Sequence, residues 1–151
     1  MKQTPQEQKI RERMAALSQD GFMGSDVRGL NEVIDEDRSA LERMGLTTEQ
    51  MADALEDVLR LAMPNFGRQV ELNHLRATYE EAMGRIPCPW GGHGLYAKGQ
   101  VELVDTRTGR RVWFTPLSIH LIRAHGFFEG RGSRYRLEPA QLAQMLGLVE
   151  G

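Results

Sequence analysis

The sequence predicts an α+β protein, in which an N-terminal region of about three helices packs on a C-terminal unit of a β-hairpin and a helix. Apolar residues recur at helical spacing through residues 1–64. Strand-forming residues flank a turn after residue 100. With 40% hydrophobic and 26% charged residues, the composition excludes collagen-like chains, coiled-coil rods and wholesale disorder.

Charge separates the two ends of the chain. Residues 1–87 contain 11 Lys and Arg against 16 Asp and Glu, and residues 88–151 contain 8 against 5. The overall charge of −2 argues against nonspecific adhesion to nucleic acid or membranes. We therefore expect an acidic helical subregion, 1–64, and an α+β subregion, 65–151, within one compact domain.

The single cysteine fits a reducing compartment, because it excludes an intramolecular disulfide. The chain has no apolar stretch near the roughly 18 residues that cross a bilayer, and its start has no apolar leader segment. These features predict a cytoplasmic protein without a membrane partner.

The first predicted helix follows Thr4 and Pro5, which are favourable at the N-cap and the first helical position. Ser25 and Asp26 are candidate caps for a second helix, which stops at Gly45. Thr47 and Gln50 then have the spacing of a capping box and begin a third helix, which ends near residues 63–64.

The second and third helices also fit a DNA-binding helix-turn-helix by spacing. The exposed side chains of the third helix, however, are the carboxylates of Glu49, Asp53, Glu56 and Asp57. Carboxylates repel DNA phosphates, so we interpret the pair as a packed helical hairpin.

Residues 65–86 are ambiguous. Residue types in their first part alternate with the period of a strand, whereas the stretch HLRATYEEAM is rich in helix-forming residues. We expect a strand followed by a short helical turn.

The rest of the chain has clearer signals. Residues 100–114 predict a β-hairpin with Gly109 in its loop. Thr115 and Pro116 begin a helix over 116–125, and a final short helix opens at Glu138 and Pro139.

The strongest candidate site is a zinc centre formed by Cys88, His93, His120 and His125. The first two belong to PCPWGGHG, whose prolines and glycines favour a tight turn, and the last two to the helix IHLIRAH. Tetrahedral structural zinc takes four thiolate or imidazole ligands. On an ideal helix, however, positions 120 and 125 lie roughly 140° apart, so we expect a frayed last turn to redirect His125.

Two other interpretations use the same residues. In one, Cys88 is a small buried apolar residue and the histidines make ordinary hydrogen bonds. In the other, Cys88 and a histidine form a catalytic pair, or three ligands hold a hydrolytic metal, with Glu129 as the orienting group or general base.

The segment 126–136, GFFEGRGSRYR, is a candidate anion-binding loop. Arg131, Ser133 and Arg134 lie at its expected tip, where guanidinium groups and a hydroxyl can bind phosphate or carboxylate. Nucleic acid or another acidic partner is the corresponding expectation. Alternatively, the segment is a tight surface turn. For Arg136 we expect pairing with one of the acidic helical segments, residues 32–37 or 53–57.

Together these observations predict a small cytoplasmic binding or regulatory protein with a structural zinc site and a basic Gly/Arg loop. The alternative is a small metal- or cysteine-dependent hydrolase that uses Cys88, a histidine and Glu129.

Overall fold

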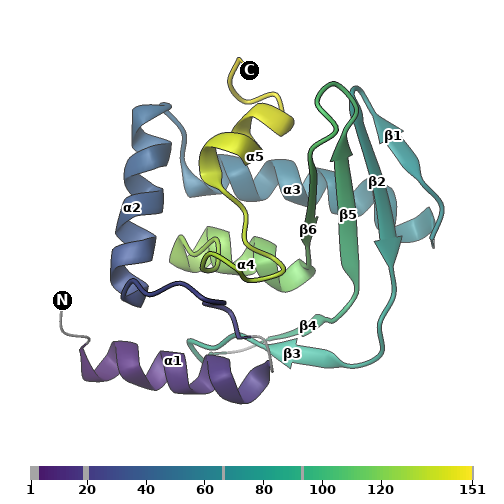
Figure 1. The fold of residues 1–151 in the computed structure, drawn as a ribbon. Helices are drawn as coiled ribbons and strands as arrows, with labels where there is room; N and C mark the ends of the chain where they lie inside the picture. The colour runs from purple at the N-terminus through teal and green to yellow at the C-terminus, as the bar shows by residue number, and fades with distance from the viewer. Residues whose placement is uncertain (1–3, 19–20, 66, 93, 151) are drawn as a thin grey trace.

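The computed structural model describes residues 4–18, 21–65, 67–92 and 94–150. Within these ranges the chain forms five α-helices and a mostly antiparallel set of strands, so the predicted α+β class is confirmed (Figure 1). None of the described helices is long and apolar enough to cross a membrane.

Three helices precede the strands: α1 (Pro5–Leu17), α2 (Leu30–Arg43) and α3 (Thr48–Ala62), the last continued by a 3₁₀ turn at Met63–Asn65. Thr4 and Thr47 both form the capping boxes that their sequence context favours. The second helix begins later than predicted, at Leu30. Asp26 does not cap it, because its carboxylate binds the Arg28 side chain and the Arg131 backbone N–H instead.

A four-stranded antiparallel sheet lies beside these helices, in the order β1 (Val70–Leu72), β2 (Leu75–Glu80), β5 (Gln100–Asp105) and β6 (Arg111–Phe114). The predicted hairpin over 100–114 is formed by β5 and β6. The helical turn expected within residues 65–86 was wrong. Residues 75–80 instead pair with residues 100–105, and this long-range ladder overrides the local helix propensity.

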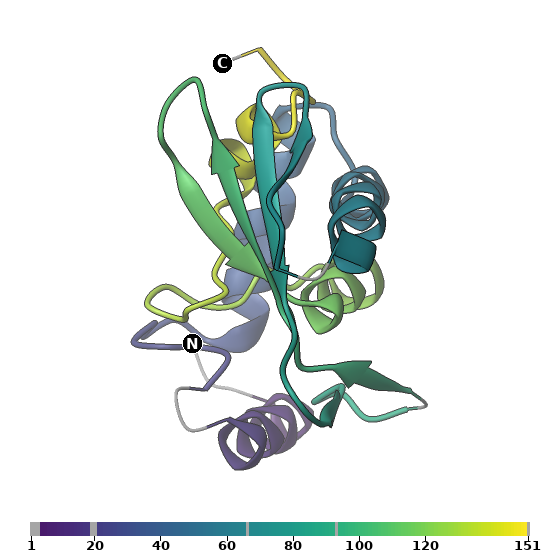
Figure 2. The ribbon, with the colours of Figure 1, turned by 90° about the vertical axis from the view of Figure 1, so that its right-hand side faces the viewer.

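A separate two-stranded sheet follows, formed by β3 (Arg85–Pro87) and β4 (Leu95–Ala97). Figure 2 shows this hairpin beyond the end of the larger sheet, at the same end of the molecule as α1. It carries Cys88 directly after β3. The polypeptide then returns through β5 and β6 to α4 (Pro116–His125), and the last helix is α5 (Pro139–Met145).

Helix α4 contributes to two hydrophobic clusters. Ile119 and Ile122 pack with α3, the large sheet and α5, whereas Leu117 and Leu121 pack with α1, α2 and Cys88. Both clusters therefore contain residues from each side of the boundary predicted near residue 64. This shared packing holds α4 firmly against the β3–β4 hairpin.

Candidate metal centre

Helix α4 has strong local signals at both ends, which fix the orientation of its two histidines. Thr115 and Ser118 form a buried capping box at its start. Gly126, with φ of 64°, ends the helix in the left-handed conformation that glycine adopts without strain. His120 and His125 therefore lie on a helix that is regular to its last residue.

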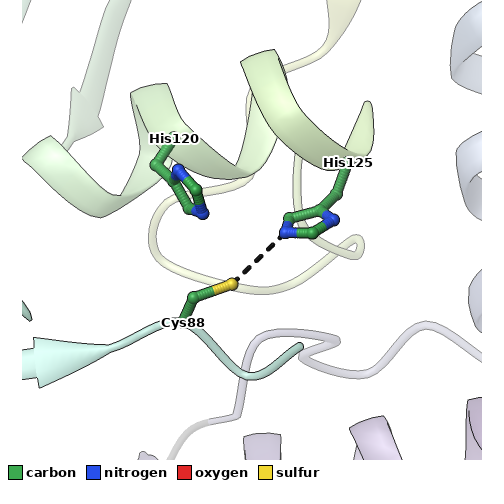
Figure 3. A group of neighbouring side chains, drawn as sticks. All are labelled: Cys88, His120 and His125. Carbon is green, nitrogen blue, oxygen red and sulfur yellow. Dashed lines mark hydrogen bonds between the residues drawn. The ribbon is translucent and has the colours of Figure 1, made fainter. Parts of the chain in front are cut away.

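Cys88 lies in a tight turn after β3. The turn is closed by a hydrogen bond from the Gly91 N–H to the Cys88 carbonyl oxygen, at 2.9 Å. Arg13 of α1 donates to the carbonyl oxygen of Pro89 at 3.2 Å and so holds the turn against the first helix. The Cys88 side chain is buried and faces α4 (Figure 3).

The structure brings Cys88, His120 and His125 together. One ligand atom from each residue lies within 4.8 Å of the others, and Cys88 Sγ is 3.4 Å from His125 Nε2. Both imidazole rings extend from the same side of α4 toward the sulfur (Figure 3). These three residues could hold a metal ion.

The two histidines converge without the frayed helix end that we expected. Their ring centroids are 5.4 Å apart, with the ring planes at 82°. Each imidazole lies against an aromatic ring of the β3–β4 hairpin, although α4 stays regular to its last residue. Convergence therefore comes from side-chain rotation and not from unwinding of the last turn.

Two aromatic residues that the sequence analysis did not single out fix the imidazoles in place. Trp90 stacks on His125 with a centroid distance of 4.3 Å and an interplanar angle of 9°. Tyr96 stacks on His120 at 4.9 Å. Trp90 lies two residues after Cys88, and this proximity could have marked it as part of the site. Its contact with His125, however, depends on the fold.

Burial favours the neutral form of all three groups. It raises the pKa of the Cys88 thiol, although hydrogen bonds from the backbone of Trp90 and Gly91 oppose part of that rise. It lowers the pKa of His120, with a further contribution from Arg123, and the pKa of His125, with a further contribution from His120. Two neutral imidazoles are ready metal ligands, whereas the thiol must lose its proton first.

The predicted fourth ligand, His93, lies outside the described residues. Its assignment to the zinc site stays a prediction.

Glu129, the residue assigned to the catalytic alternative, lines a separate pocket with Ser133 and Tyr135. Cys88 is not part of the lining of that pocket. The structure thus gives no common cleft for Cys88 and Glu129 among the described pocket residues.

The groups of the predicted anion-binding loop have partners within the protein. Arg131 pairs with Glu138 at 3.6 Å, and Ser133 donates to Glu129 at 2.6 Å. Arg134 donates to Gln100 at 3.2 Å and lies over the Trp113 ring. Anion binding by Arg131, Ser133 and Arg134 stays a prediction, in which a partner would compete with these internal contacts.

The acidic face of α3 also has a partner within the fold. Arg123 of α4 pairs with Glu49, Asp53 and Glu56 at 3.4, 2.7 and 3.3 Å. This contact packs α3 against α4. The packed hairpin expected for α2 and α3 is therefore wrong: among the described elements, α3 packs mainly against α4, whereas α2 packs against α5 and α1.

Comparison with known proteins found no matching family model, no matching curated protein and no matching solved structure. The functional assignment therefore depends on the chemistry of the site itself.

Proposed function

We propose that this protein is a zinc-binding protein, in which Cys88, His120 and His125 hold one Zn²⁺ that fixes the β3–β4 hairpin to α4. The observation that carries the proposal is the mutual approach of three ligand atoms within 4.8 Å. In this proposal the ion has a structural role in a binding or regulatory protein.

The distances fit the coordination sphere of zinc. Zn–N and Zn–S bonds of about 2.0–2.1 and 2.3 Å place the ligand atoms of a tetrahedral site roughly 3.3–3.8 Å apart. The separation of 3.4 Å between Cys88 Sγ and His125 Nε2 already lies in this range. His120 supplies the third ligand atom, which lies within 4.8 Å of each of the other two.

The donor chemistry also favours zinc. One thiolate and two imidazoles form a mixed sulfur and nitrogen set, which suits Zn²⁺ and does not suit Mg²⁺ or Ca²⁺, whose preferred ligands are oxygens. Stacking on Trp90 and Tyr96 restricts both imidazoles before the ion arrives. Less side-chain freedom is then lost on binding.

The cysteine-enzyme alternative has less support. A nucleophilic cysteine acts as the thiolate, whereas burial raises the pKa of Cys88. Its proposed orienting residue, Glu129, is also assigned to a different pocket. A metal needs no free thiolate, because coordination itself displaces the proton.

Metal analysis of protein purified without a histidine tag tests the proposal. We expect one zinc per chain in the parent protein and less than a tenth of that occupancy in Cys88→Ala and His125→Ala. The matched control is His74→Gln, because His74 lies outside the cluster and its Nε2 contacts the Met145 carbonyl oxygen. This variant should retain full zinc occupancy.

Substitution with Co²⁺ identifies the ligands directly. A sulfur-to-cobalt charge-transfer band should appear in the parent protein and disappear in Cys88→Ala. His93→Ala tests the predicted fourth ligand: a loss of affinity supports it and a closed structural site, whereas unchanged affinity leaves water as the fourth ligand and counts against a purely structural role. Parent protein that binds neither zinc nor cobalt after reduction of the thiol would overturn the proposal.

A further inference from the structure

A pocket of about 270 Å³ lies on another face of the β3–β4 hairpin, away from the three metal ligands. It is lined by the end of α1 with Gly21 and Phe22, by β3 and the end of β4, by the start of α4 and by residues of the segment 129–135. Pockets for drug-sized ligands are about 300–1,000 Å³, so this one suits a smaller molecule.

Glu129 is the most unusual residue of this pocket. Glu129 is only 4% exposed, and its backbone φ of 68° lies in the left-handed region that favours glycine. Ser133 donates a hydrogen bond to Oε1 at 2.6 Å. Among the described residues, none donates a hydrogen bond to Oε2, and this oxygen is accessible to solvent, since no fully buried side-chain oxygen there lacks a partner.

The backbone around Glu129 is held by contacts that do not need its carboxyl group. The Gly130 N–H donates to the Phe22 carbonyl oxygen at 2.8 Å, and the Ser25 N–H donates to the Arg131 carbonyl oxygen at 3.0 Å. Glycine would satisfy the same backbone with less strain and without a buried carboxyl. Apart from the Ser133 hydroxyl, the carboxyl group has no role in holding this loop, and a buried acid in a strained conformation at the wall of a pocket points to a ligand.

The remaining lining supplies two other kinds of contact. Phe22, Leu117 and Ile86 form an apolar wall. Lys98 and Arg134 are exposed and place positive charge at the mouth of the pocket. These three features complement one kind of molecule. The buried acid suits an ammonium group, the apolar wall suits an apolar body, and the cations at the mouth suit a carboxylate.

We propose that this pocket binds a free α-amino acid with an apolar side chain, whose ammonium group contacts Glu129 and whose carboxylate contacts Lys98 and Arg134. The site uses none of the metal ligands, so it stands independently of the zinc proposal.

The protonation of Glu129 supports the same chemistry. Burial raises its pKa to about 7, against the opposing hydrogen bond from Ser133. An ammonium group that enters the pocket favours the carboxylate and displaces this proton. Binding should therefore release protons at pH 6 and strengthen as the pH rises to 8.

Calorimetric titration of the parent protein with L-phenylalanine and L-leucine tests the proposal, with two partial ligands for comparison. 3-Phenylpropionate lacks the ammonium group, and 2-phenylethylamine lacks the carboxylate. We expect at least one of the two amino acids to bind, and with at least tenfold higher affinity than either partial ligand.

Two variants test separately the contact with the ammonium group and the contact with the carboxylate of the ligand. Glu129→Gln should weaken amino-acid binding at least tenfold, remove its pH dependence and leave 3-phenylpropionate binding unchanged. Lys98→Met should weaken binding of the amino acid and of 3-phenylpropionate, but not of 2-phenylethylamine. Because Lys98 is exposed, this variant remains informative even if Glu129→Gln fails to fold.

The matched control is Glu81→Gln, since Glu81 is exposed and lies outside the pocket lining. It should bind the amino acids like the parent. Absence of binding to both amino acids at millimolar concentration would overturn the proposal, as would equal affinity of the parent and Glu129→Gln for phenylalanine.

Discussion

Arg136 and Asp37 form a buried ion pair between residues that are 99 positions apart in the sequence. Nη1 of Arg136 lies 2.5 Å from Oδ2 of Asp37, and Nη2 lies 3.0 Å from Oδ1. Both side chains are 6% exposed, and Nη1 also donates to the Glu129 carbonyl oxygen at 2.8 Å. The pair joins α2 to the segment before α5, so Arg136 pairs with the first of the two acidic segments that the sequence offered. The sequence alone suggested an exposed pair, whereas here burial raises the pKa of Asp37, so the carboxylate depends on the Arg136 guanidinium as its partner.

The first prediction concerns this pair. Arg136→Met should lower the free energy of unfolding by about 3–5 kcal/mol, because it leaves the Asp37 carboxylate buried without its partner. Urea denaturation measures the change. The double variant Arg136→Met with Asp37→Leu should recover a large part of the loss, since it removes the uncompensated charge.

Arg60→Met is the matched control for the first prediction. Arg60 pairs with Glu56 at 2.8 Å, but its side chain is 74% exposed. Its loss should cost at most about 0.5 kcal/mol. Equal effects of the Arg136 and Arg60 substitutions would show that burial does not raise the cost of leaving a carboxylate without its partner.

The second prediction concerns Glu129 and pH. Its pKa is about 7 in the folded protein against 4.5 for an ordinary glutamate, so between these values the folded state binds more protons than the unfolded state. The stabilisation of the folded state by the proton on Glu129 is complete below pH 4.5 and is lost as the pH rises through 7. The total change is about 3 kcal/mol.

The variant Glu129→Gln isolates this contribution, because His120 and His125 act in the opposite direction. Burial lowers the pKa of both histidines, so they destabilise the fold as the pH falls. Chemical denaturation of metal-free protein at pH 5 and pH 8 should therefore show a parent-minus-variant difference that decreases with pH. A difference that is constant across this range would contradict the raised pKa.

The third prediction concerns the proton released when zinc binds. Both imidazoles of the centre are neutral at pH 7, whereas burial keeps Cys88 protonated. Zinc binding should therefore release about one proton per ion, and zinc affinity should rise with pH. Calorimetry in two buffers of different ionisation enthalpy measures the proton count.

Cys88→His is the matched control for proton release. It replaces the thiol by a further imidazole. Because an imidazole binds the metal in its neutral form, the number of protons released per zinc should fall toward zero. Equal proton release by the parent and this variant would show that Cys88 is not the group that loses the proton.

The fourth prediction concerns the close approach of two loops. A Cβ atom at Gly130 would lie 2.3 Å from the backbone oxygen of Met23, which the hydrogen-bonded loop cannot easily move. Gly130→Ala should therefore lower stability by about 3 kcal/mol. Gly45→Ala, with φ of 71° and no atom within 4 Å of the added carbon, should cost only about 1 kcal/mol of backbone strain.

Thermal denaturation distinguishes these two glycine variants. A larger loss of melting temperature in Gly130→Ala supports the steric contact between the loops. If the two variants lose the same melting temperature, backbone strain alone explains both losses, and the steric contact at Gly130 adds nothing.

Local chemistry made much of the helical structure predictable. Thr4, Thr47 and Thr115 satisfy backbone N–H groups within three residues of themselves, so the starts of α1, α3 and α4 depend on short stretches of chain. The left-handed Gly126 likewise ends α4 by a local preference. These signals survive in the fold because no distant contact competes with them.

Residues 75–80 show where such signals fail. Their composition favours a helix, but Leu75, Ala77 and Tyr79 are buried on one face of β2, and the strand pairs with β5 along its whole length. The same limit explains Asp26, whose carboxylate binds Arg28 and the distant Arg131 backbone. In both cases a partner that is far away in sequence decides the structure.

The sequence by itself determined the α+β class, the capped starts of α1, α3 and α4 and the residue types that can hold a metal. Only the tertiary structure decided that Cys88, His120 and His125 meet, that Trp90 and Tyr96 orient the imidazoles, and that Glu129 lies apart from them in its own pocket. The reason is physical: capping and turn preferences act over a few residues, whereas these contacts need the β5–β6 hairpin to return α4 to the turn after β3.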